Sequence, residues 1–242
     1  MFKKWFLLLL AILMIFSLAA CNKQDPTPPS NDDPTPNKPT PSTPQAEPTL
    51  VDSGALQNGA ITWELYTDDS MTGTLYLKGS GALEDLESAE DQPWWIYGDD
   101  RIYGDRNLME NDIVLITAIV VEEGITKLGE NTLAEQESVT SITLPSTLTV
   151  LSNACLKDCK NLRTVSGGTG ITLIEANALK YCTVLESIEL SSKLTEVGES
   201  AFGGLQRALS VRFHGTEAQW SAITVALGNE KLTSATVLYP TE

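Results

Sequence analysis

A fixed repeat organises the second half of this chain of 242 residues. From position 119 onward, cuts after every 23 residues align the apolar positions of four copies, 119–141, 142–164, 165–187 and 188–210. A period in the twenties is typical of a solenoid, in which each coil buries its apolar side chains only against neighbouring coils. The repeat therefore predicts stacked coils that present surfaces, and it argues against a deep catalytic cleft.

The apolar positions within one copy predict the path of each coil. Position 1 is apolar in every copy and position 3 in all but the third, a spacing typical of a short strand with one buried face. Positions 7, 10 and 15 bring further apolar side chains inward. In the third copy Ser166, Gly167 and Gly168 follow Val165, so we expect a weaker or bent strand there. In the fourth copy Leu209 comes one place after the usual apolar position, which predicts a slip of one residue.

Two of the copies carry more specific motifs. ITLPSTLTVLSNACLKDCKNL and IELSSKLTEVGESAFGGL resemble the BspA-like leucine-rich repeats of bacterial surface proteins, through Leu144-Pro145 and through Cys159 and Cys182 in one column. The resemblance covers roughly residues 54–240. It implies a leucine-rich repeat solenoid, rich in β-structure with short helical turns, of about five coils of 23 residues.

Both ends of the repeat array have atypical segments. Residues 60–66 and 73–78 alternate in polarity around a turn-rich segment and predict a β-hairpin. With a joining strand at 113–121, they make residues 50–118 a small N-terminal β module or cap. Residues 119–210 are the four repeats, and residues 211–242 are expected to be a C-terminal capping repeat with Trp220 in position 10 and a last strand at 235–239. Residues 84–111, acidic and aromatic, have no assigned structure.

The N-terminus predicts export and attachment to a membrane. Two lysines precede an apolar run of 16 residues, which is shorter than a membrane-spanning helix and typical of a secretory signal, residues 1–20. The run ends in Leu18-Ala19-Ala20-Cys21, which resembles the bacterial lipobox and implies lipidation of Cys21; an uncleaved signal anchor is the alternative. Residues 21–49, rich in Pro, Thr and Asp, are expected to be a disordered, extended tether.

Charge and cysteine content exclude several classes of function. The formal net charge of −16 argues against nucleic-acid partners and against anionic membrane surfaces. Cys159 and Cys182 share a column and could approach within disulfide range, but a buried reduced state is favoured because this column is a small apolar one. With one histidine and no Cys-x-x-Cys pair, we expect no metal and no cofactor. No set of nucleophile and base is evident, so we expect no enzyme.

Two groups of residues are candidates for ligand binding. The first consists of strand residues that alternate with the core and are expected to line one face of the solenoid: Glu122, Thr143, Ser166, Glu189, Ser191, Arg212 and His214. The second is the aromatic segment with Trp94, Trp95, Tyr97 and Tyr103, whose rings would stack on sugars. The favoured interpretation of this second group is that it caps the open N-terminal end of the core.

These observations predict a lipid-anchored leucine-rich repeat protein, exported across the inner membrane and displayed at the bacterial cell surface. We expect an adhesin or protein-binding module, monomeric and non-catalytic, that meets the membrane through its N-terminal lipid. The alternative is a carbohydrate-binding lipoprotein that uses the Trp94/Trp95 segment. The partner is an extracellular protein under the first interpretation and an extracellular glycan under the second.

Overall fold

The computed structural model describes residues 47–68, 71–98 and 114–240. The chain divides into two compact units, residues 1–44 and 45–242, and the described residues all belong to the second. Cys21, the expected signal and most of the tether therefore lie outside the described residues, as does Tyr103. The proposed boundaries of those segments stay predictions.

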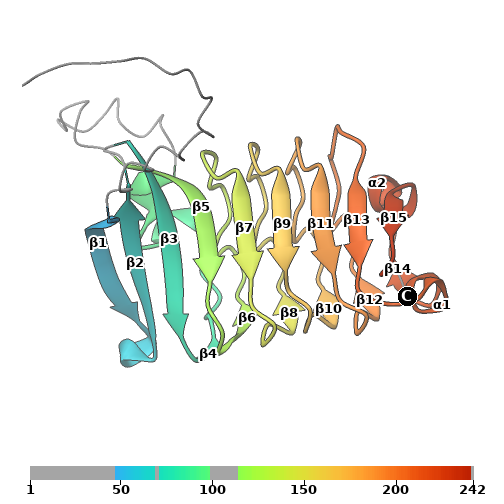
Figure 1. Cartoon of the computed structure of the whole chain (residues 1–242), viewed down its shortest axis with the longest axis horizontal. Helices are drawn as coiled ribbons and strands as arrows, with labels where there is room; N and C mark the ends of the chain where they lie inside the picture. The colour runs from blue at the N-terminus through green and yellow to red at the C-terminus, as the bar shows by residue number, and fades with distance from the viewer. Residues whose placement is uncertain (1–46, 69–70, 99–113, 241–242) are drawn as a thin grey trace, which may run out of the picture. The chain divides into compact units, whose positions relative to one another are not determined.

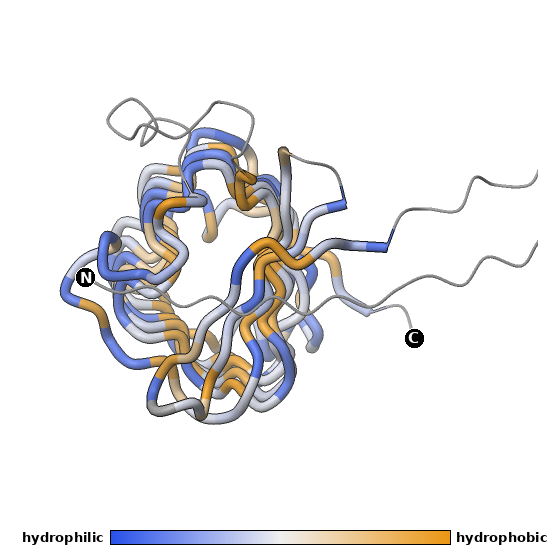
Figure 2. Tube along the Cα trace, turned by 90° about the vertical axis from the view of Figure 1, so that its left-hand side faces the viewer, coloured by the Kyte–Doolittle hydropathy of each residue, from blue (hydrophilic) through white to orange (hydrophobic). Residues whose placement is uncertain are grey.

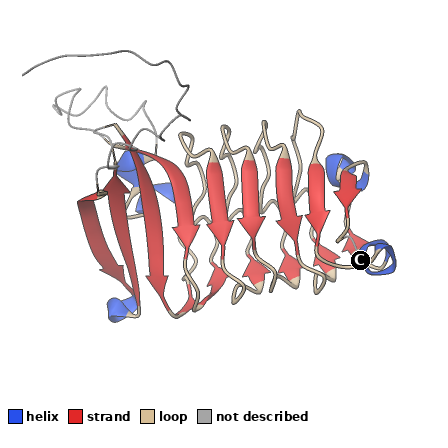
Figure 3. Cartoon of the chain, viewed as in Figure 1, coloured by secondary structure: helices blue, strands red, loops and turns tan. Residues whose placement is uncertain are grey.

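Two sheets form the walls of residues 47–240, and strands dominate over helical turns (Figure 1 and Figure 3). The larger sheet has nine strands in the order β1 (Thr49–Leu56), β2 (Ile61–Thr67), β3 (Thr72–Gly79), β5 (Leu115–Val121), β7 (Ser141–Leu144), β9 (Thr164–Gly167), β11 (Ser187–Leu190), β13 (Ser210–Phe213) and β15 (Thr236–Leu238). The smaller sheet has six short strands: β4 (Gly81–Ala82), β6 (Ile125–Leu128), β8 (Val150–Leu151), β10 (Leu173–Ile174), β12 (Glu196–Val197) and β14 (Thr224–Val225). The described helical segments are short: 3₁₀ turns at Gln57–Gly59, Ala89–Asp91 and Trp95–Tyr97, and the helices α1 (Glu217–Ser221) and α2 (Glu230–Thr233).

Each repeat forms one coil that contributes a strand to both sheets. Parallel pairing places Ile119 opposite Ile142, Ile142 opposite Val165, and Ile188 opposite Val211, so position 1 stacks from coil to coil. Figure 2 looks along the stack, where successive coils superpose around one core. These stacked positions are almost fully buried, which confirms both the period and the predicted fold class of a leucine-rich repeat solenoid.

A ladder of threonines runs along the six-stranded sheet. Thr126, Thr149, Thr172 and Thr195 occupy the same repeat position, and each later backbone N–H donates to the carbonyl of the threonine before it. The side-chain hydroxyls of Thr149, Thr172 and Thr195 donate to the same carbonyls at 2.9, 3.2 and 3.1 Å. Because one carbonyl then accepts two hydrogen bonds, threonine at this position ties neighbouring coils together at the surface.

The N-terminal hairpin is confirmed and proves longer than expected. β2 and β3 pair antiparallel from Ile61 opposite Gly79 to Thr67 opposite Gly73. β3 then pairs in parallel with β5, so the module extends the sheet of the repeats without a break. The edge strand β1 was not predicted, because most of its side chains are exposed and its sequence, TLVDSGAL, shows little apolar alternation.

Both expected irregularities within the repeats are present. β9 pairs with β7 over four residues but with β11 over only two, and its end bends at Gly167 and Gly168, whose φ angles are +78° and +64°. In the fourth copy Leu209 is buried while Ala208 is exposed, which confirms the slip of one residue.

The predicted register of the last coil was wrong. Val225, not Trp220, lies opposite Val197 in the six-stranded sheet and takes position 10. The cause is the helix α1, which lengthens this coil by five residues before β14 and turns Trp220 onto Phe213, with ring centroids 5.3 Å apart. The capping box that starts α1, formed by Thr216 and Gln219, was present in the sequence as T-x-x-Q.

The three repeat cysteines are free and fully buried. The thiols of Cys159 and Cys182 each donate to a backbone carbonyl of the preceding coil, that of Leu133 and that of Leu156, both at 3.2 Å. Burial raises the pKa of both Cys155 and Cys182, since the charged thiolate would lose its hydration. These thiols act as small core residues and not as nucleophiles.

Candidate binding surface

Strand register lines up one outward-facing residue from each strand of the nine-stranded sheet. From β1 to β7 the row is Ser53, Glu64, Tyr76, Val120 and Thr143. From β9 to β15 it continues with Ser166, Glu189, Arg212 and Leu238, with pairing interrupted only where β9 bends away from β11. The predicted face, with its small polar residues, is therefore a continuous surface that runs from β1 to β15. We call this surface the outer face.

Charged groups gather near the C-terminal end of the outer face. The carboxylate of Glu189 accepts a hydrogen bond from the backbone N–H of Gly167 at 3.1 Å. The same oxygen lies 3.3 Å from Nε2 of His214, and the other oxygen lies 3.9 Å from Nε of Arg212. Glu189 is held by these contacts, while the Arg212 side chain remains 65% exposed and available to a partner.

The remaining predicted residues of this face have different environments. Thr143 and Ser166 are neighbours, with their hydroxyl oxygens 3.3 Å apart, and Glu122 lies 3.8 Å from Nζ of Lys78. Ser191 was expected to be exposed but is fully buried, so it is removed from the candidates. Its hydroxyl donates to the carbonyl of Thr169 at 2.7 Å and accepts from the N–H of Lys193, because the chain turns inward after β11.

An open pocket adjoins this charged group at the C-terminal coil. Its volume is about 550 Å³, and its lining includes His214, Thr216, Gln219, Tyr239 and Pro240. Tyr239 and its neighbour Leu238 are 36% and 50% exposed, and the Tyr239 ring packs edge-on against Phe213. These two residues were not singled out in the sequence, although the predicted last strand, 235–239, contains them.

The model of the BspA type leucine rich repeat region matches residues 110–221, in six copies. Residues 110–221 belong to the BspA-type leucine-rich repeat family. This confirms the resemblance inferred from Leu144-Pro145 and from the cysteine column.

One solved structure shares the architecture of the BspA-type array, and two others are similar at lower scores. A leucine-rich repeat protein from Eubacterium ventriosum is 21% identical, with a TM-score of 0.52 over 75% of this chain and 42% of that one. A leucine rich cell surface protein from Faecalibacterium prausnitzii is 18% identical, with a TM-score of 0.44 over 71% and 42%. The T. pallidum leucine rich repeat protein is 14% identical, with a TM-score of 0.40 over 66% and 67%. This chain thus spans less than half of the Eubacterium protein, and no curated protein matches it.

The aromatic segment before the BspA-type array is part of the core. Trp94 is 1% exposed and packs edge-on against Trp63, with ring centroids 6.1 Å apart. Trp94 is therefore not accessible for stacking on a sugar ring, and its burial agrees with the capping interpretation. Trp95 is half-buried, and the Tyr97 hydroxyl donates to Asp52 at 2.9 Å, so the segment is fastened to β1.

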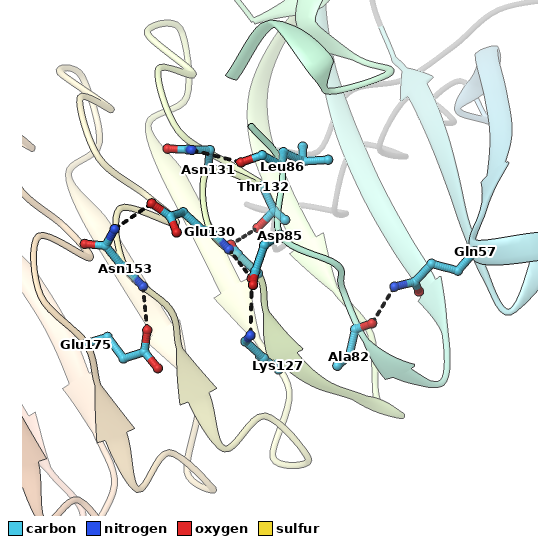
Figure 4. Close-up of polar contacts among 11 residues, drawn as sticks. Gln57, Ala82, Asp85, Leu86, Lys127, Glu130, Asn131, Thr132, Asn153 and Glu175 are labelled. Atoms are coloured by element: carbon cyan, nitrogen blue, oxygen red, sulfur yellow. Dashed lines mark hydrogen bonds and ion pairs between the residues drawn. The ribbon is translucent and has the colours of Figure 1, made fainter. Parts of the chain in front are cut away.

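Polar contacts join this cap to the first coils (Figure 4). Asp85 accepts a hydrogen bond from the backbone N–H of Glu130 at 2.8 Å and forms an ion pair with Lys127 at 3.2 Å. The hydrogen bond from Glu130, followed by the contact with Lys127, holds the pKa of the Asp85 carboxyl below its ordinary value. Glu130 in turn accepts the side-chain amide of Asn153 at 2.6 Å, and the Asn153 backbone N–H donates to Glu175. The chain of bonds spans three coils and positions the cap, and it resembles no catalytic arrangement.

Within the described residues, groups of three His, Cys, Asp or Glu side chains suitable for a metal ion are absent. In the same part of the chain, none of the helices is long and apolar enough to cross a membrane.

Proposed function

We propose that this protein is a non-catalytic, lipid-anchored protein of the bacterial cell surface that binds an extracellular protein through the outer face. The observation that carries the proposal is the C-terminal end of that face, where His214 and Tyr239 line an open pocket of about 550 Å³ and where Arg212 and Leu238, opposite each other on β13 and β15, are exposed. Protein interfaces concentrate their binding energy in a few such arginine and aromatic residues beside a pocket. The flat polar row through Thr143 and Ser166 would supply the surrounding contact area.

The charge of the chain favours a partner with a basic surface. A formal net charge of −16 steers basic proteins toward the solenoid and repels acidic ones. Arg212 is a basic residue on the surface of this acidic protein, and it would bind one acidic group of the partner. We expect association to slow as salt rises, because long-range attraction is screened.

Surface display is proposed from the N-terminal sequence and the family. The lipobox-like Leu18-Ala19-Ala20-Cys21 would give the mature chain a diacylated N-terminal cysteine. Two or more acyl chains anchor a protein stably in a bilayer, whereas one chain gives only reversible binding. The Faecalibacterium relative in fold is described as a cell surface protein, which agrees with this placement.

The binding proposal is tested with purified protein on an array of extracellular matrix proteins, followed by kinetic measurements on any positive. We expect Arg212→Glu and Tyr239→Ala each to weaken binding at least tenfold, mainly by faster dissociation. Arg207→Glu is the matched control, because Arg207 is 51% exposed and paired with Glu186, yet lies outside strand β13 and the pocket. Equal effects of the Arg207 and Arg212 changes would rule out the outer face.

Lipid attachment is tested separately in a bacterial host that processes lipoproteins. We expect the chain to incorporate a labelled fatty acid and to sediment with membranes, and we expect Cys21→Ala to lose both properties. Membrane association of the Cys21→Ala variant without label would instead indicate an uncleaved signal anchor.

A further inference from the structure

Two tyrosines, Tyr66 and Tyr76, lie on the part of the outer face that the N-terminal module forms. Neither is among the residues proposed to bind a protein. Along β2 and β3 the inward residues are buried, while Tyr66 and Tyr76 face outward and are half-buried. Their ring centroids lie 5.8 Å apart and their planes meet at 85°, an edge-to-face pair. The two strands thus present aromatic surface on a sheet that elsewhere shows mostly small polar side chains.

A pocket opens on one side of this pair. Its volume is about 320 Å³, within the range of sites for small molecules. Besides the two rings, its lining includes Thr74 on β3, Thr117 on β5, Asp68 after β2 and Pro48 before β1. Three strands and a turn therefore supply two aromatic rings, several hydroxyls and one exposed carboxylate to a single open hollow.

The rings are fixed from the opposite side. Nζ of Lys78 lies 5.8 Å from the Tyr66 ring centroid and 5.5 Å from that of Tyr76, a cation–π arrangement. Glu64 accepts a hydrogen bond from Lys78 at 2.8 Å and one from the Tyr66 hydroxyl at 2.9 Å. The bond from Lys78, followed by that from Tyr66, lowers the pKa of Glu64, so the carboxylate stays charged and the network persists at neutral pH. A ligand would meet rings that are already ordered, which reduces the entropy lost on binding.

The chemistry of the pocket selects among ligand classes. Aromatic faces accept the C–H surface of a sugar ring, and hydroxyl and carboxylate groups suit its hydroxyls. Asp68 and the net charge of −16 disfavour anionic ligands, and the polar lining disfavours lipids. We propose that this pocket, the tyrosine site, binds a neutral pyranose of an oligosaccharide, with Tyr66 and Tyr76 as stacking surfaces and Asp68 as an acceptor. The tyrosine site lies on the part of the outer face formed by β2 and β3, and it shares no residue with the surface around Arg212 that is proposed to bind protein.

The test uses purified full-length protein and three neutral tetrasaccharides, maltotetraose, cellotetraose and chitotetraose, in ligand-detected NMR and calorimetry. We expect at least one to bind, and we expect Tyr76→Ala to weaken its binding about tenfold or more, because the variant loses one of the two stacking surfaces. Tyr181→Ala is the matched control, because Tyr181 is an exposed tyrosine with Lys180 over its ring at 5.4 Å but lies on a turn of the repeats. The Tyr181→Ala variant should bind the sugar as tightly as the wild type does.

Two further variants separate loss of the site from loss of the fold. Tyr76→Phe keeps the ring and should keep binding, and Asp68→Asn, at an exposed turn position, should weaken binding without lowering the melting temperature. Arg212→Glu should leave sugar binding unchanged, so this proposal and the protein-binding proposal fail independently. The tyrosine site is overturned if none of the three sugars binds, or if Tyr76→Ala and Asp68→Asn both bind as tightly as the wild type.

Discussion

At the scale of single residues, each of the four repeats has two left-handed backbone positions. One of them holds Asn131, Ala154, Asn177 and Ser200, with φ angles between 53° and 58°. Asparagine visits this region readily, but for alanine it costs roughly 1–2 kcal/mol, because Cβ approaches the following carbonyl. Ala154 is therefore strained relative to Asn131 and Asn177, which occupy the same position in the flanking coils.

We expect Ala154→Asn to stabilise the protein by about 0.5–1 kcal/mol, since asparagine already fills this position in the flanking coils. Urea unfolding measures the change. Ala178→Asn is the control: Ala178 is fully buried and has no positive φ, so burial of the amide should destabilise the protein there. A loss of stability in both variants would show that the volume at position 154, and not its φ angle, controls the outcome.

The buried thiols should make the folded protein less stable at alkaline pH. Burial raises the pKa of Cys155 and Cys182 in the folded state, whereas the unfolded thiols keep the ordinary value near 9.0. Below pH 9 the thiols are protonated in both states and do not change the stability with pH. Above pH 9 the unfolded state releases the thiol protons while the folded state keeps them, so the free energy of unfolding falls. We expect the free energy of unfolding to fall by about 1.4 kcal/mol per pH unit for each thiol above pH 9.

Urea unfolding at pH 8, 9 and 10 under reducing conditions measures this slope. Cys155→Ala should unfold more easily at pH 8, because a small cavity remains, but its stability should decline less steeply with pH. Parallel declines in the variant and the wild type would mean that other groups cause the alkaline loss.

At the scale of elements, the sequence predicts best where a pattern repeats. The strands β7, β9, β11 and β13 follow from apolar spacing that neighbouring copies reinforce. The bend at Gly167 follows from the departure of the third copy from that spacing, and the hairpin β2–β3 follows from its own alternation around a turn. β1 lacks such support, because it has no copy to compare and most of its side chains are exposed. The last coil was misaligned because α1 inserts residues that a fixed period does not anticipate.

The candidate site was predictable in part for the same reason. Alternation along a strand identifies Thr143, Ser166, Glu189 and Arg212 as outward-facing, and strand register brings them into one row. Ser191 was misplaced because it follows the end of β11, where alternation no longer applies. The sequence did not single out Tyr66 and Tyr76, because the predicted hairpin, with strands at 60–66 and 73–78, leaves open which residues face each other across it.

The N-terminal cap offers a test of what its tryptophans do. Trp94 is buried against Trp63 and closes the core, so we expect Trp94→Ala to destabilise the protein by about 3–5 kcal/mol. Trp95 is only half-buried, and Trp95→Ala should cost about 1 kcal/mol or less. Urea unfolding measures both changes, and hydrogen exchange should show that Trp94→Ala loosens the strands nearest the cap. A small effect of Trp94→Ala would reopen a binding role for this segment.

At the scale of the whole molecule, stability should be distributed along the stack. Each coil contacts only its two neighbours, so a solenoid behaves as a sum of coils and of the interfaces between them. The third coil interrupts this regularity, because its bent strand pairs with β11 over only two residues. Removal of that coil would place the second copy directly on the fourth, whose apolar positions match it.

We therefore expect a chain that lacks residues 165–187 to fold cooperatively, with both caps and the surface around Arg212 retained. Its urea m-value should fall by roughly a tenth, in proportion to the surface lost. The control removes residues 165–186, one residue fewer, so one extra residue remains in front of β11 and must be accommodated there as a bulge. That variant should fold with a lower urea midpoint than the 23-residue deletion. If both deletions unfold the protein, the coils are not interchangeable and the third makes contacts that its neighbours cannot replace; if both are equally stable, the period of 23 residues does not set the register of the stack.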